Sequence, residues 1–412
     1  MKRIAIIGGG ISGLTVLHYL KQRFGENVET TLYEREASIG GTIHSLKRDS
    51  CLFEWGPNGF LDNQPATLQL IDELGLKDQL IEAQKSSKRR YIQLNGQLQQ
   101  VPMGPLSLIR SSLLTSQDKR SLIKGIFKKK ISTDRSIHEY VSQRFCVNIA
   151  ERLVDPFISG VYAGDIKRLH MASAFPKLKG NGPGKTRMRS FKRGMGQIIE
   201  AFDKRYKKSI ITTTEVNLAQ LKPDITIIST PAYSAADILK NINPVLSNIL
   251  SQIPYAPIAV VGLLFTKDSF KRKPDGLGFL VPSSENKEIV GVLIESNVYA
   301  QRARADQLMF RVMLGGMHHQ DIINRSQEKI LELAIQELDH IYGVVSKPIE
   351  SFVKIWPQAI PQYEINYPHN RELISEQCAK TPGLYLCANY LGGISLNDCV
   401  KNAKTLASLL TV

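Results

Sequence analysis

The sequence contains no uninterrupted apolar run long enough to cross a membrane, so any membrane contact would be peripheral. Cysteine is scarce and unpaired: the five residues are scattered, and none forms a C-x-x-C pair. This usage disfavours a disulfide framework and a zinc site, and it suits free thiols in a reducing cytoplasm. The cysteines are Cys51, Cys146, Cys378, Cys387 and Cys399. We also expect no signal or transit peptide ahead of the first predicted strand.

Negative charge is also in short supply. The 412 residues include 53 Lys and Arg but only 38 Asp and Glu, which gives a formal net charge of +15. Nucleic acid, an anionic membrane surface and an acidic small molecule would each suit such a balance. No zinc-finger or RNA-binding signature accompanies the charge, so nucleic acid is the least favoured partner. The length favours two or three domains over a single core.

A glycine-rich motif opens the chain. Ile4–Ile7 form a short β-branched run, and Gly8, Gly10 and Gly13 follow with the spacing G-x-G-x-x-G. Apolar residues at helical spacing come next. Glycines there permit a tight turn, close approach of a pyrophosphate and close helix–strand packing, and a helix N-terminus favours negative charge. The motif therefore predicts a dinucleotide site, although an ordinary strand–turn–helix has the same spacing.

Three later features narrow that prediction. A second predicted strand over residues 28–33 ends in Glu34, which lies 21 residues after Gly13, where a ribose-binding carboxylate is expected. The pair Gly40-Gly41 would let the backbone pass close to the pyrophosphate, which a plain nicotinamide dehydrogenase does not require. The turn 56–59 reads Gly-Pro-Asn-Gly and suits a loop beside an isoalloxazine. Together these features favour FAD.

The chain resembles the oxygen-dependent, FAD-containing protoporphyrinogen oxidase family, part of a larger group with the monoamine oxidases and phytoene desaturases. The most specific segments are G-V-Y-A-G-D at 160–165 and N-Y-L-G-G-I-S-L-N-D-C at 389–399. The remaining segments that carry the resemblance are residues 7–14, 34–42, 56–59, 194–195 and 360–363. Two departures stand out: Arg193 replaces a usual glycine, and Asn58 stands where some relatives have arginine.

The resemblance implies which residues hold FAD. The pyrophosphate would lie on the opening motif, the ribose and adenine on the next strand end and on one later residue, and the flavin on three loops. The implied residues are Gly8, Gly9, Gly10, Ile11, Ser12, Gly13, Glu34, Arg35, Gly40, Gly41, Thr42, Gly56, Pro57, Asn58, Gly59, Val216, Trp356, Ile394, Ser395 and Leu396. A helix that starts near Asn397 would point its positive end at the flavin.

The resemblance also implies a substrate site for a porphyrinogen. Arg90 would hold a propionate, since a guanidinium can bind a carboxylate through two hydrogen bonds. Gly160 would present its carbonyl to the pyrrole nitrogens, with Asn58 nearby, and three apolar residues would sandwich the macrocycle. Those three are Leu277, Leu280 and Met313. Without the resemblance, Arg90 reads as part of a solvated basic turn and the three apolar residues as ordinary strand core.

The implied reaction is oxidation of protoporphyrinogen IX to protoporphyrin IX by successive hydride transfers to flavin N5, with O2 or another acceptor reoxidising the flavin. No catalytic side chain and no metal are expected. The alternatives are a coproporphyrinogen oxidase of the same fold, an amine oxidase or carotenoid desaturase, and a flavoprotein-like scaffold without turnover. A homodimer and delivery of the product to a ferrochelatase are further expectations.

The expected fold is α/β, with a discontinuous Rossmann-like FAD-binding domain over residues 1–84, 191–232 and 376–412. A mixed β-sheet substrate domain would span 233–375, and a helical, membrane-facing domain 85–190. In that last region apolar residues alternate with basic ones, which suits an anionic leaflet, although a helical cap on a sheet would read alike. The apolar residues are Leu106, Leu108, Ile109, Leu113, Leu114, Leu122, Ile123, Ile126 and Phe127, and Lys128–Lys130 close the run. We therefore expect a cytoplasmic protein peripherally bound to the inner face of the cell membrane.

Overall fold

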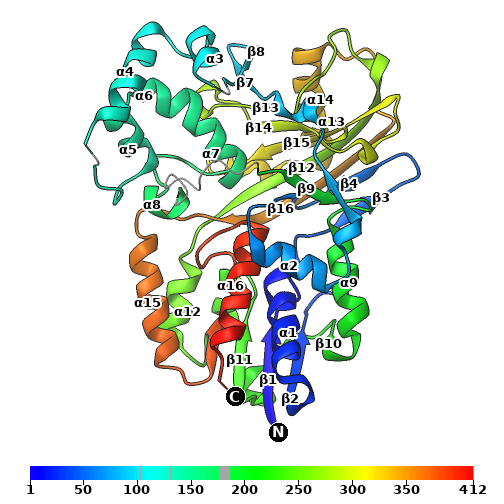
Figure 1. Cartoon of the computed structure of the whole chain (residues 1–412), viewed down its shortest axis with the longest axis vertical. Helices are drawn as coiled ribbons and strands as arrows, with labels where there is room; N and C mark the ends of the chain where they lie inside the picture. Colours follow the sequence, from blue (N-terminus) through cyan, green and yellow to red (C-terminus); the bar gives the residue numbers. More distant parts are fainter. Residues whose placement is uncertain (103, 130, 176–185, 412) are drawn as a thin grey trace.

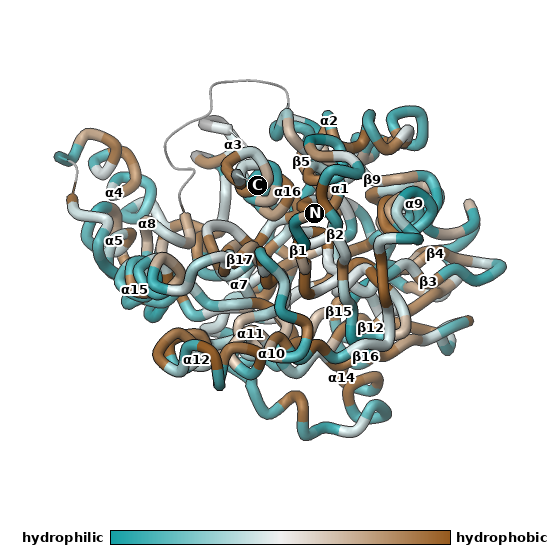
Figure 2. The backbone as a smooth tube through the Cα atoms, turned by 90° about the horizontal axis from the view of Figure 1, so that it is seen from below, coloured by the Kyte–Doolittle hydropathy of each residue, from teal (hydrophilic) through white to brown (hydrophobic). Residues whose placement is uncertain are grey.

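A computed structural model describes residues 1–102, 104–129, 131–175 and 186–411. It contains two large sheets (Figure 1). The lower one in that view carries both termini, and the upper one lies beside a group of helices. Seen from below, the two termini lie close together beside α1 and α16 (Figure 2). This arrangement confirms the α/β class.

The first sheet is five-stranded and entirely parallel, in the order β10-β2-β1-β11-β17. Its strands are β1 (Lys2–Ile7), β2 (Val28–Tyr33), β10 (Ile210–Ile211), β11 (Ile225–Ile228) and β17 (Leu384–Leu386). The pairing of β17 with β11 brings a strand from residues 376–412, the last segment of the predicted FAD-binding domain, into the N-terminal sheet. Chain order reverses between β1 and β11, and ligands of doubly wound sheets bind outside the carboxyl ends of the strands at such a switch point.

Helices cover both faces of this sheet. One face packs on α1 (Ile11–Phe24), α2 (Pro65–Glu73), α9 (Gly196–Tyr206) and α16 (Leu396–Leu409) through a core that includes Ile4 and Ile6. The other face, which includes Ile7 and Ile228, packs on α11 (Ala232–Leu239), α12 (Pro244–Ser251) and α15 (Tyr367–Ala379). Residues 233–251 and 367–375, placed in the substrate domain from the sequence, therefore pack on the FAD-domain sheet.

The second sheet has seven strands in the order β16-β12-β15-β14-β13-β7-β8. They are β7 (Tyr91–Leu94), β8 (Gln97–Gln100), β12 (Tyr255–Thr266), β13 (Gly278–Leu280), β14 (Ile289–Ile294), β15 (Gln307–Gly315) and β16 (Glu350–Pro361). Helix α14 (Gln327–Tyr342) packs on one face of this sheet. The other face, which includes Ile258 and Val260, packs partly on Phe53 and Trp55 from the N-terminal part of the chain. This second face is the one that meets the candidate site.

Two small sheets lie between the five-stranded and the seven-stranded sheet in the fold. A hairpin pairs β3 (Ser45–Lys47) with β4 (Leu52–Glu54), and a three-stranded sheet has the order β5-β9-β6. The strands of that sheet are β5 (Phe60–Leu61), β6 (Leu80–Glu82) and β9 (Met188–Phe191). Both assemblies lie next to the turn at residues 56–59, so they position a predicted flavin loop.

The region 85–190 differs from its prediction as a purely helical domain. Strands β7 and β8 lie in it, and β7 pairs with β13 of the seven-stranded sheet. After a 3-10 turn at Lys85–Lys88, the α-helices of the region begin only beyond Gln100. They are α3 (Pro105–Arg110), α4 (Ser116–Phe127), α5 (Ile137–Arg144), α6 (Val147–Ile149), a π-helical segment (Ala150–Val154), α7 (Asp155–Tyr162) and α8 (Met171–Ala174). The loop predicted at Gly180–Gly184 lies outside the described residues.

The stretch from Leu106 to Phe127, which the sequence places in the predicted helical domain, forms two helices. Thr115 and Asp118 form a capping box at the N-terminus of α4. A capping box fixes the start of a helix, so α4 begins as a new helix rather than continuing α3. Leu113 and Leu114 between the helices are buried in the core. Among the described residues no helix is long and apolar enough to span a membrane.

Candidate active site

The opening glycine motif lies at the switch point of the parallel sheet. Gly8 donates its N–H to the carbonyl of Tyr33 at 2.8 Å and has a φ of 107°, a conformation that favours glycine. A Cβ on Gly8 would lie 3.0 Å from the backbone of Ser229 and Thr230, which follow β11. A Cβ on Gly13 would lie 2.1 Å from the Gly8 carbonyl oxygen, so only glycine lets α1 approach β1 this closely.

The second glycine pair lies against the first motif. Gly40 donates its N–H to the carbonyl of Gly9 at 2.8 Å. A Cβ built on Gly41 would lie 3.2 Å from the Cα of Gly10. The two loops that the sequence assigned to one pyrophosphate therefore touch each other.

Open space lies over Gly10, at the N-terminus of α1. Among the described residues, a Cβ there would meet no heavy atom within 4 Å, and no side chain caps α1 or places an acid in its first turn. The hydroxyls of Ser229 and Thr230 beside it are buried without a hydrogen-bond partner among the described residues. A positive helix end with free N–H groups and unpartnered hydroxyls is the donor set that a pyrophosphate needs, so these residues fit FAD.

Glu34 lies at the same edge. Its carboxylate accepts the N–H of Gly9 at 2.6 Å and that of Glu36 at 2.9 Å. Its backbone carbonyl accepts the N–H of Thr214 at 3.0 Å. This hydrogen bond places the segment from Thr214 to Val216 beside Glu34. Val216 packs partly buried against the same core as Ile7. Arg35 is exposed and pairs with Glu36 instead.

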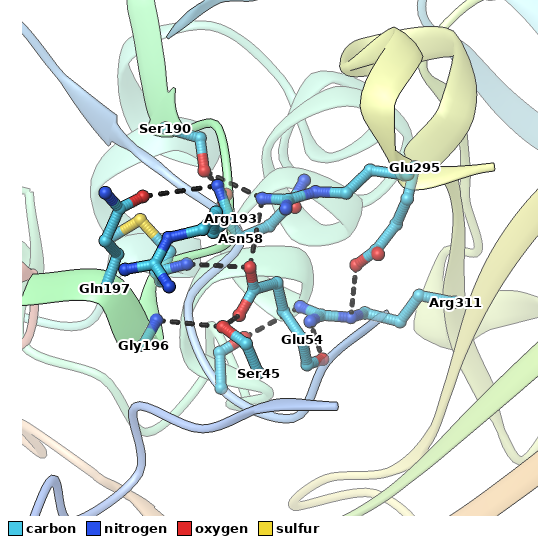
Figure 3. A network of polar contacts seen from close by, with 12 residues as sticks. Ser45, Glu54, Asn58, Ser190, Arg193, Gly196, Gln197, Glu295 and Arg311 are labelled. Atoms are coloured by element: carbon cyan, nitrogen blue, oxygen red, sulfur yellow. Dashed lines mark hydrogen bonds and ion pairs between the residues drawn. The ribbon is translucent and has the colours of Figure 1, made fainter. Parts of the chain in front are cut away.

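The loop at residues 54–59 is held by a buried ionic network that the sequence analysis missed (Figure 3). Glu54, 1% exposed, forms an ion pair with the fully buried Arg302 at 3.0 Å. It also accepts the hydroxyl of Ser45 at 2.6 Å and the N–H of Met195 at 2.8 Å. Burial raises the pKa of Glu54 to about 7, and the Arg302 guanidinium opposes that shift.

A second buried pair completes the network. Arg311 lies 3.0 Å from Glu295 and donates to the carbonyls of Gly56, at 2.8 Å, and of Glu54. Burial also raises the pKa of Glu295, against the pull of Arg311. Arg302 extends the network by donating at 2.8 Å to Ser190, whose hydroxyl donates at 3.0 Å to the carbonyl of Asn58. Charged side chains therefore fix the backbone of the predicted flavin loop.

The departure at Arg193 leaves this network intact. Its side chain is turned toward the exposed Glu200, at 2.6 Å, and the next residue, Gly194, keeps a positive φ of 92°. The turn into α9 thus still has a glycine where the backbone requires one.

At the C-terminal flavin segment, helix α16 begins at Leu396, one residue before the predicted start. Ser395 caps it, and the carboxylate of Asp398 accepts the Ser395 hydroxyl at 2.5 Å. A carboxylate in the first turn weakens the positive field expected there. Ile394 packs, partly buried, against the core of the helical region, which carries α7.

Three predicted substrate residues meet on the site-facing side of the seven-stranded sheet. A Cβ on Gly160 of α7 would lie 2.7 Å from Leu280, so the helix backbone lies directly over that side chain. Leu280 pairs across the strands with Gly291, and Gly291 with Met313. Gly291 has no side chain, and a Cβ there would lie 2.9 Å from Leu280, so the Leu280 side chain covers this position of the row.

The same row continues to a cation. Met313 pairs with Val260, and Val260 with Lys354 of β16. Lys354 places its ammonium 4.0 Å from the ring centroid of Trp356, the predicted flavin-side wall. Burial lowers the pKa of Lys354. Because paired residues of neighbouring strands point to the same face, Lys354 faces the site together with Met313.

The remaining predicted substrate residues lie at the edges of this row. Leu277 precedes β13, and its N–H donates to the carbonyl of Arg89 at 2.8 Å. Arg90 is exposed directly before β7, where Ile92 pairs with Leu280. Alternation along the strand puts Arg90 and Ile92 on one face, so Arg90 borders the row at the end opposite Lys354. Asn58 lies in the loop that the ionic network holds, and its Oδ1 is buried without a partner among the described residues.

The family model for flavin containing amine oxidoreductases matches residues 11–411. The chain belongs to this family. It is therefore an FAD-dependent oxidoreductase, and the fit of the switch-point residues to a pyrophosphate agrees with that cofactor. In this oxidoreductase the edge of the parallel sheet fits the dinucleotide, and the seven-stranded mixed sheet presents an apolar face to the candidate site.

The curated relatives of this oxidoreductase include a protoporphyrinogen oxidase and a coproporphyrinogen oxidase. Protoporphyrinogen oxidase 2 of Arabidopsis thaliana is 26% identical over 479 residues, covering 99% of this chain and 94% of the relative. Coproporphyrinogen III oxidase of Bacillus subtilis is 24% identical over 461 residues, covering 99% and 97%. Both aligned spans exceed the 412 residues of this chain, so the alignments contain gaps in it.

Solved structures show the same fold. A candidate protoporphyrinogen oxidase from Exiguobacterium sp. 255-15 superposes with a TM-score of 0.85 at 21% identity, covering 99% of this chain and 98% of that one. A reduced UDP-galactopyranose mutase superposes with a TM-score of 0.77 at 14% identity, covering 99% and 93%. The fold therefore serves several chemistries, and the substrate must be argued from the site.

Proposed function

We propose that this oxidoreductase converts protoporphyrinogen IX to protoporphyrin IX, with O2 as the final electron acceptor. The observation that carries the proposal is the contact of Gly160 with Leu280, in one row with Met313. This row presents apolar side chains toward the candidate site, and cations lie at its two ends. The names of the curated relatives support the same substrate class.

FAD, when bound, accepts the hydride equivalents that the macrocycle loses. The protein would supply positioning and exclusion of water: Leu280 and Met313 would bury the apolar ring, and Gly160 would present its carbonyl to the ring nitrogens, as the resemblance implies. The ring nitrogens can exchange their own protons, so the proposal needs no side-chain acid or base.

Arg90 is proposed to bind a propionate of the substrate. Replacing it in Arg90→Ala should raise KM about tenfold or more, because a charge-assisted hydrogen bond is lost, and kcat should change less. Lys88→Ala, which removes an equally exposed cation from the same basic turn, serves as the matched control. Steady-state assays of porphyrin fluorescence measure both constants, and equal KM values for the two variants would contradict the assignment.

A coproporphyrinogen oxidase is the second candidate, and Lys354 is the observation that favours it. A substrate with four propionates needs more cations than one with two, and Lys354 adds a cation at the far end of the row from Arg90. Turnover of both porphyrinogens, followed by product fluorescence, decides between them. A preference for coproporphyrinogen that Lys354→Met abolishes would assign the second function.

We further propose that α4 gives the protein peripheral contact with an anionic membrane. Ile123, Ile126 and Phe127 are exposed, Phe127 by 83%, and Arg120 and Lys124 are exposed on the same helix. Exposed apolar side chains beside basic ones suit the inner face of a cell membrane. The side chains of Leu106 and Ile109, and Lys130, lie outside the described residues, while Leu108 and Leu122 pack partly into the core.

Co-sedimentation with vesicles tests this contact. Binding to anionic vesicles should fall at high salt and should drop several-fold in Phe127→Ser, because the buried apolar area and the electrostatic attraction act together. Val245→Ser, at an exposed apolar residue of α12, is the control. Equal binding by the two variants, or none by the wild type, would rule the contact out. The homodimer and the ferrochelatase delivery stay predictions.

A further inference from the structure

Two stacked tyrosines lie between α7, which carries Gly160, and the predicted flavin segment Ile394–Leu396. Tyr363 follows β16 and Tyr367 opens α15, and their ring centroids are 4.0 Å apart with planes 17° from parallel. Both side chains are buried. A parallel pair of buried rings forms a rigid unit, because neither ring can rotate without displacing the other.

Their hydroxyls form four hydrogen bonds with the backbone of the turn at residues 389–393, which precedes the flavin segment. Tyr363 accepts the N–H of Gly393 at 2.8 Å and donates to the carbonyl of Asn389. Tyr367 accepts the N–H of Gly392 at 2.8 Å and donates to the carbonyl of Tyr390 at 3.0 Å. Each hydroxyl therefore uses its single proton and at least one lone pair on the same turn.

The turn at residues 389–393 contains two consecutive glycines with positive φ. Gly392 and Gly393 both have positive φ, 96° and 131°, which few side-chain-bearing residues adopt. Ile394–Leu396 follow at once and are the residues expected to approach the isoalloxazine. Fixing two N–H groups and two carbonyls of this turn therefore fixes the direction in which that segment leaves it.

The same stretch of chain holds the substrate helix. Gln362 donates from its side-chain amide to the carbonyl of Tyr162, the last residue of α7, at 2.9 Å. The ring of Tyr162 packs edge-on against Tyr363, with centroids 5.9 Å apart. Gly160 lies in the same turn of α7 as Tyr162. Adjacent residues thus bind the helix under the proposed macrocycle and the turn beside the flavin.

We propose that Gln362, Tyr363 and Tyr367 are positioning residues that set the separation between the bound macrocycle and the flavin. They touch neither ligand in this assignment, and they act through α7 and through the turn at 389–393. The part about the macrocycle rests on the proposed function. The part about the flavin rests only on family membership.

The test uses the holoenzyme with both hydroxyls removed, Tyr363→Phe/Tyr367→Phe. This variant keeps the stacked rings and loses the four hydrogen bonds. Tyr342→Phe is the matched control, because Tyr342 is equally buried in the seven-stranded sheet half and its hydroxyl has no hydrogen-bond partner among the described residues. Visible circular dichroism of the bound flavin and its midpoint potential are measured first, since neither needs a substrate.

We expect the double variant to retain FAD, with a changed flavin dichroism spectrum and a shifted potential, while Tyr342→Phe matches the wild type. The rate of anaerobic flavin reduction at saturating porphyrinogen should fall roughly ten- to hundredfold with little change in KM, because the reacting atoms are misplaced. Unchanged flavin dichroism and potential would overturn the proposal. If the wild type does not reduce its flavin with porphyrinogen, the flavin measurements still decide the flavin part. Should the double variant not fold, Tyr367→Phe alone is subject to the same criteria.

Discussion

Gly10→Val should abolish stable FAD binding while leaving the fold intact. The Gly10 backbone is extended, with a φ of −73°, and an added Cβ would meet no atom of the described residues within 4 Å. It would instead fill the space over the N-terminus of α1 that the pyrophosphate needs. We expect the dissociation constant for FAD to rise about a hundredfold, the upper range of what overpacking of one site costs. Flavin absorbance per protein after purification, and a fluorescence titration of the apoprotein, measure the effect.

The chain offers an unusually close control for this variant. Gly104 is also an N-cap glycine with an extended backbone, and a Cβ there likewise meets nothing within 4 Å. Gly104→Val thus imposes the same N-cap cost on α3, far from the parallel sheet. If both variants keep FAD equally well, the pyrophosphate does not lie over Gly10.

Arg311→Met should destabilise the protein by about 3–5 kcal/mol, since it removes the cation that lies 3.0 Å from the fully buried Glu295 and leaves only the weaker attraction of Arg302. The carbonyls of Gly56 and Glu54 would lose their donor as well. We therefore expect weaker FAD binding beyond the loss of stability, because the loop at 54–59 is no longer fixed. Urea unfolding of the holoprotein, followed by fluorescence, measures the first effect and an FAD titration the second.

The destabilisation should depend on pH. Without Arg311 the folded-state pKa of Glu295 rises further above its unfolded value of about 4.3. A raised folded pKa contributes stability that is present below the unfolded pKa and is lost as the pH rises through the folded value. The variant should therefore lose more stability relative to the wild type at pH 8 than at pH 5.

Arg325→Met is the control for this second variant. Arg325 pairs with Glu288 at 2.7 Å and with Asp321 at 3.1 Å, but it is more than one-third exposed. Exposed pairs contribute about 0–1 kcal/mol, so this variant should unfold nearly like the wild type at both pH values. A loss as large as that of Arg311→Met would show that burial of the ion pair is not what matters.

Local signals made the dinucleotide edge predictable. The β-branched run before Gly8, the helical spacing after Gly13 and the position of Glu34 each depend on neighbours in sequence, and β1, α1 and β2 lie where these signals place them. The return of the C-terminal strand was predictable for another reason: a lone strand with a helix has to pair with a larger sheet.

The ionic network needed information that no local pattern contains. Arg311 stands between Phe310 and Val312 in an apolar strand, which is a signal for a buried charge but not for its partners. The carbonyl of Gly56 that it binds lies 255 positions away along the chain. Likewise, β7 and β8 read as part of a helical region because their pairing with β13 is not visible locally.

The boundaries between the domains could not be placed from the sequence for a similar reason. Helices α11, α12 and α15 each show an apolar side, yet that pattern does not say which sheet it covers. Only the packing places them on the parallel sheet. The substrate residues Gly160, Leu280 and Met313 came from the resemblance, and their meeting on one sheet face depends on strand register, which sequence spacing leaves open.

The most direct test mixes the purified holoenzyme with protoporphyrinogen under anaerobic conditions and follows the visible absorbance of the flavin. We predict rapid bleaching, appearance of porphyrin fluorescence, and return of the oxidised spectrum when O2 is admitted. Arg90→Ala should bleach more slowly at low substrate and recover at high substrate. A flavin that stays oxidised with both protoporphyrinogen and coproporphyrinogen would contradict the assignment of this oxidoreductase to porphyrinogens.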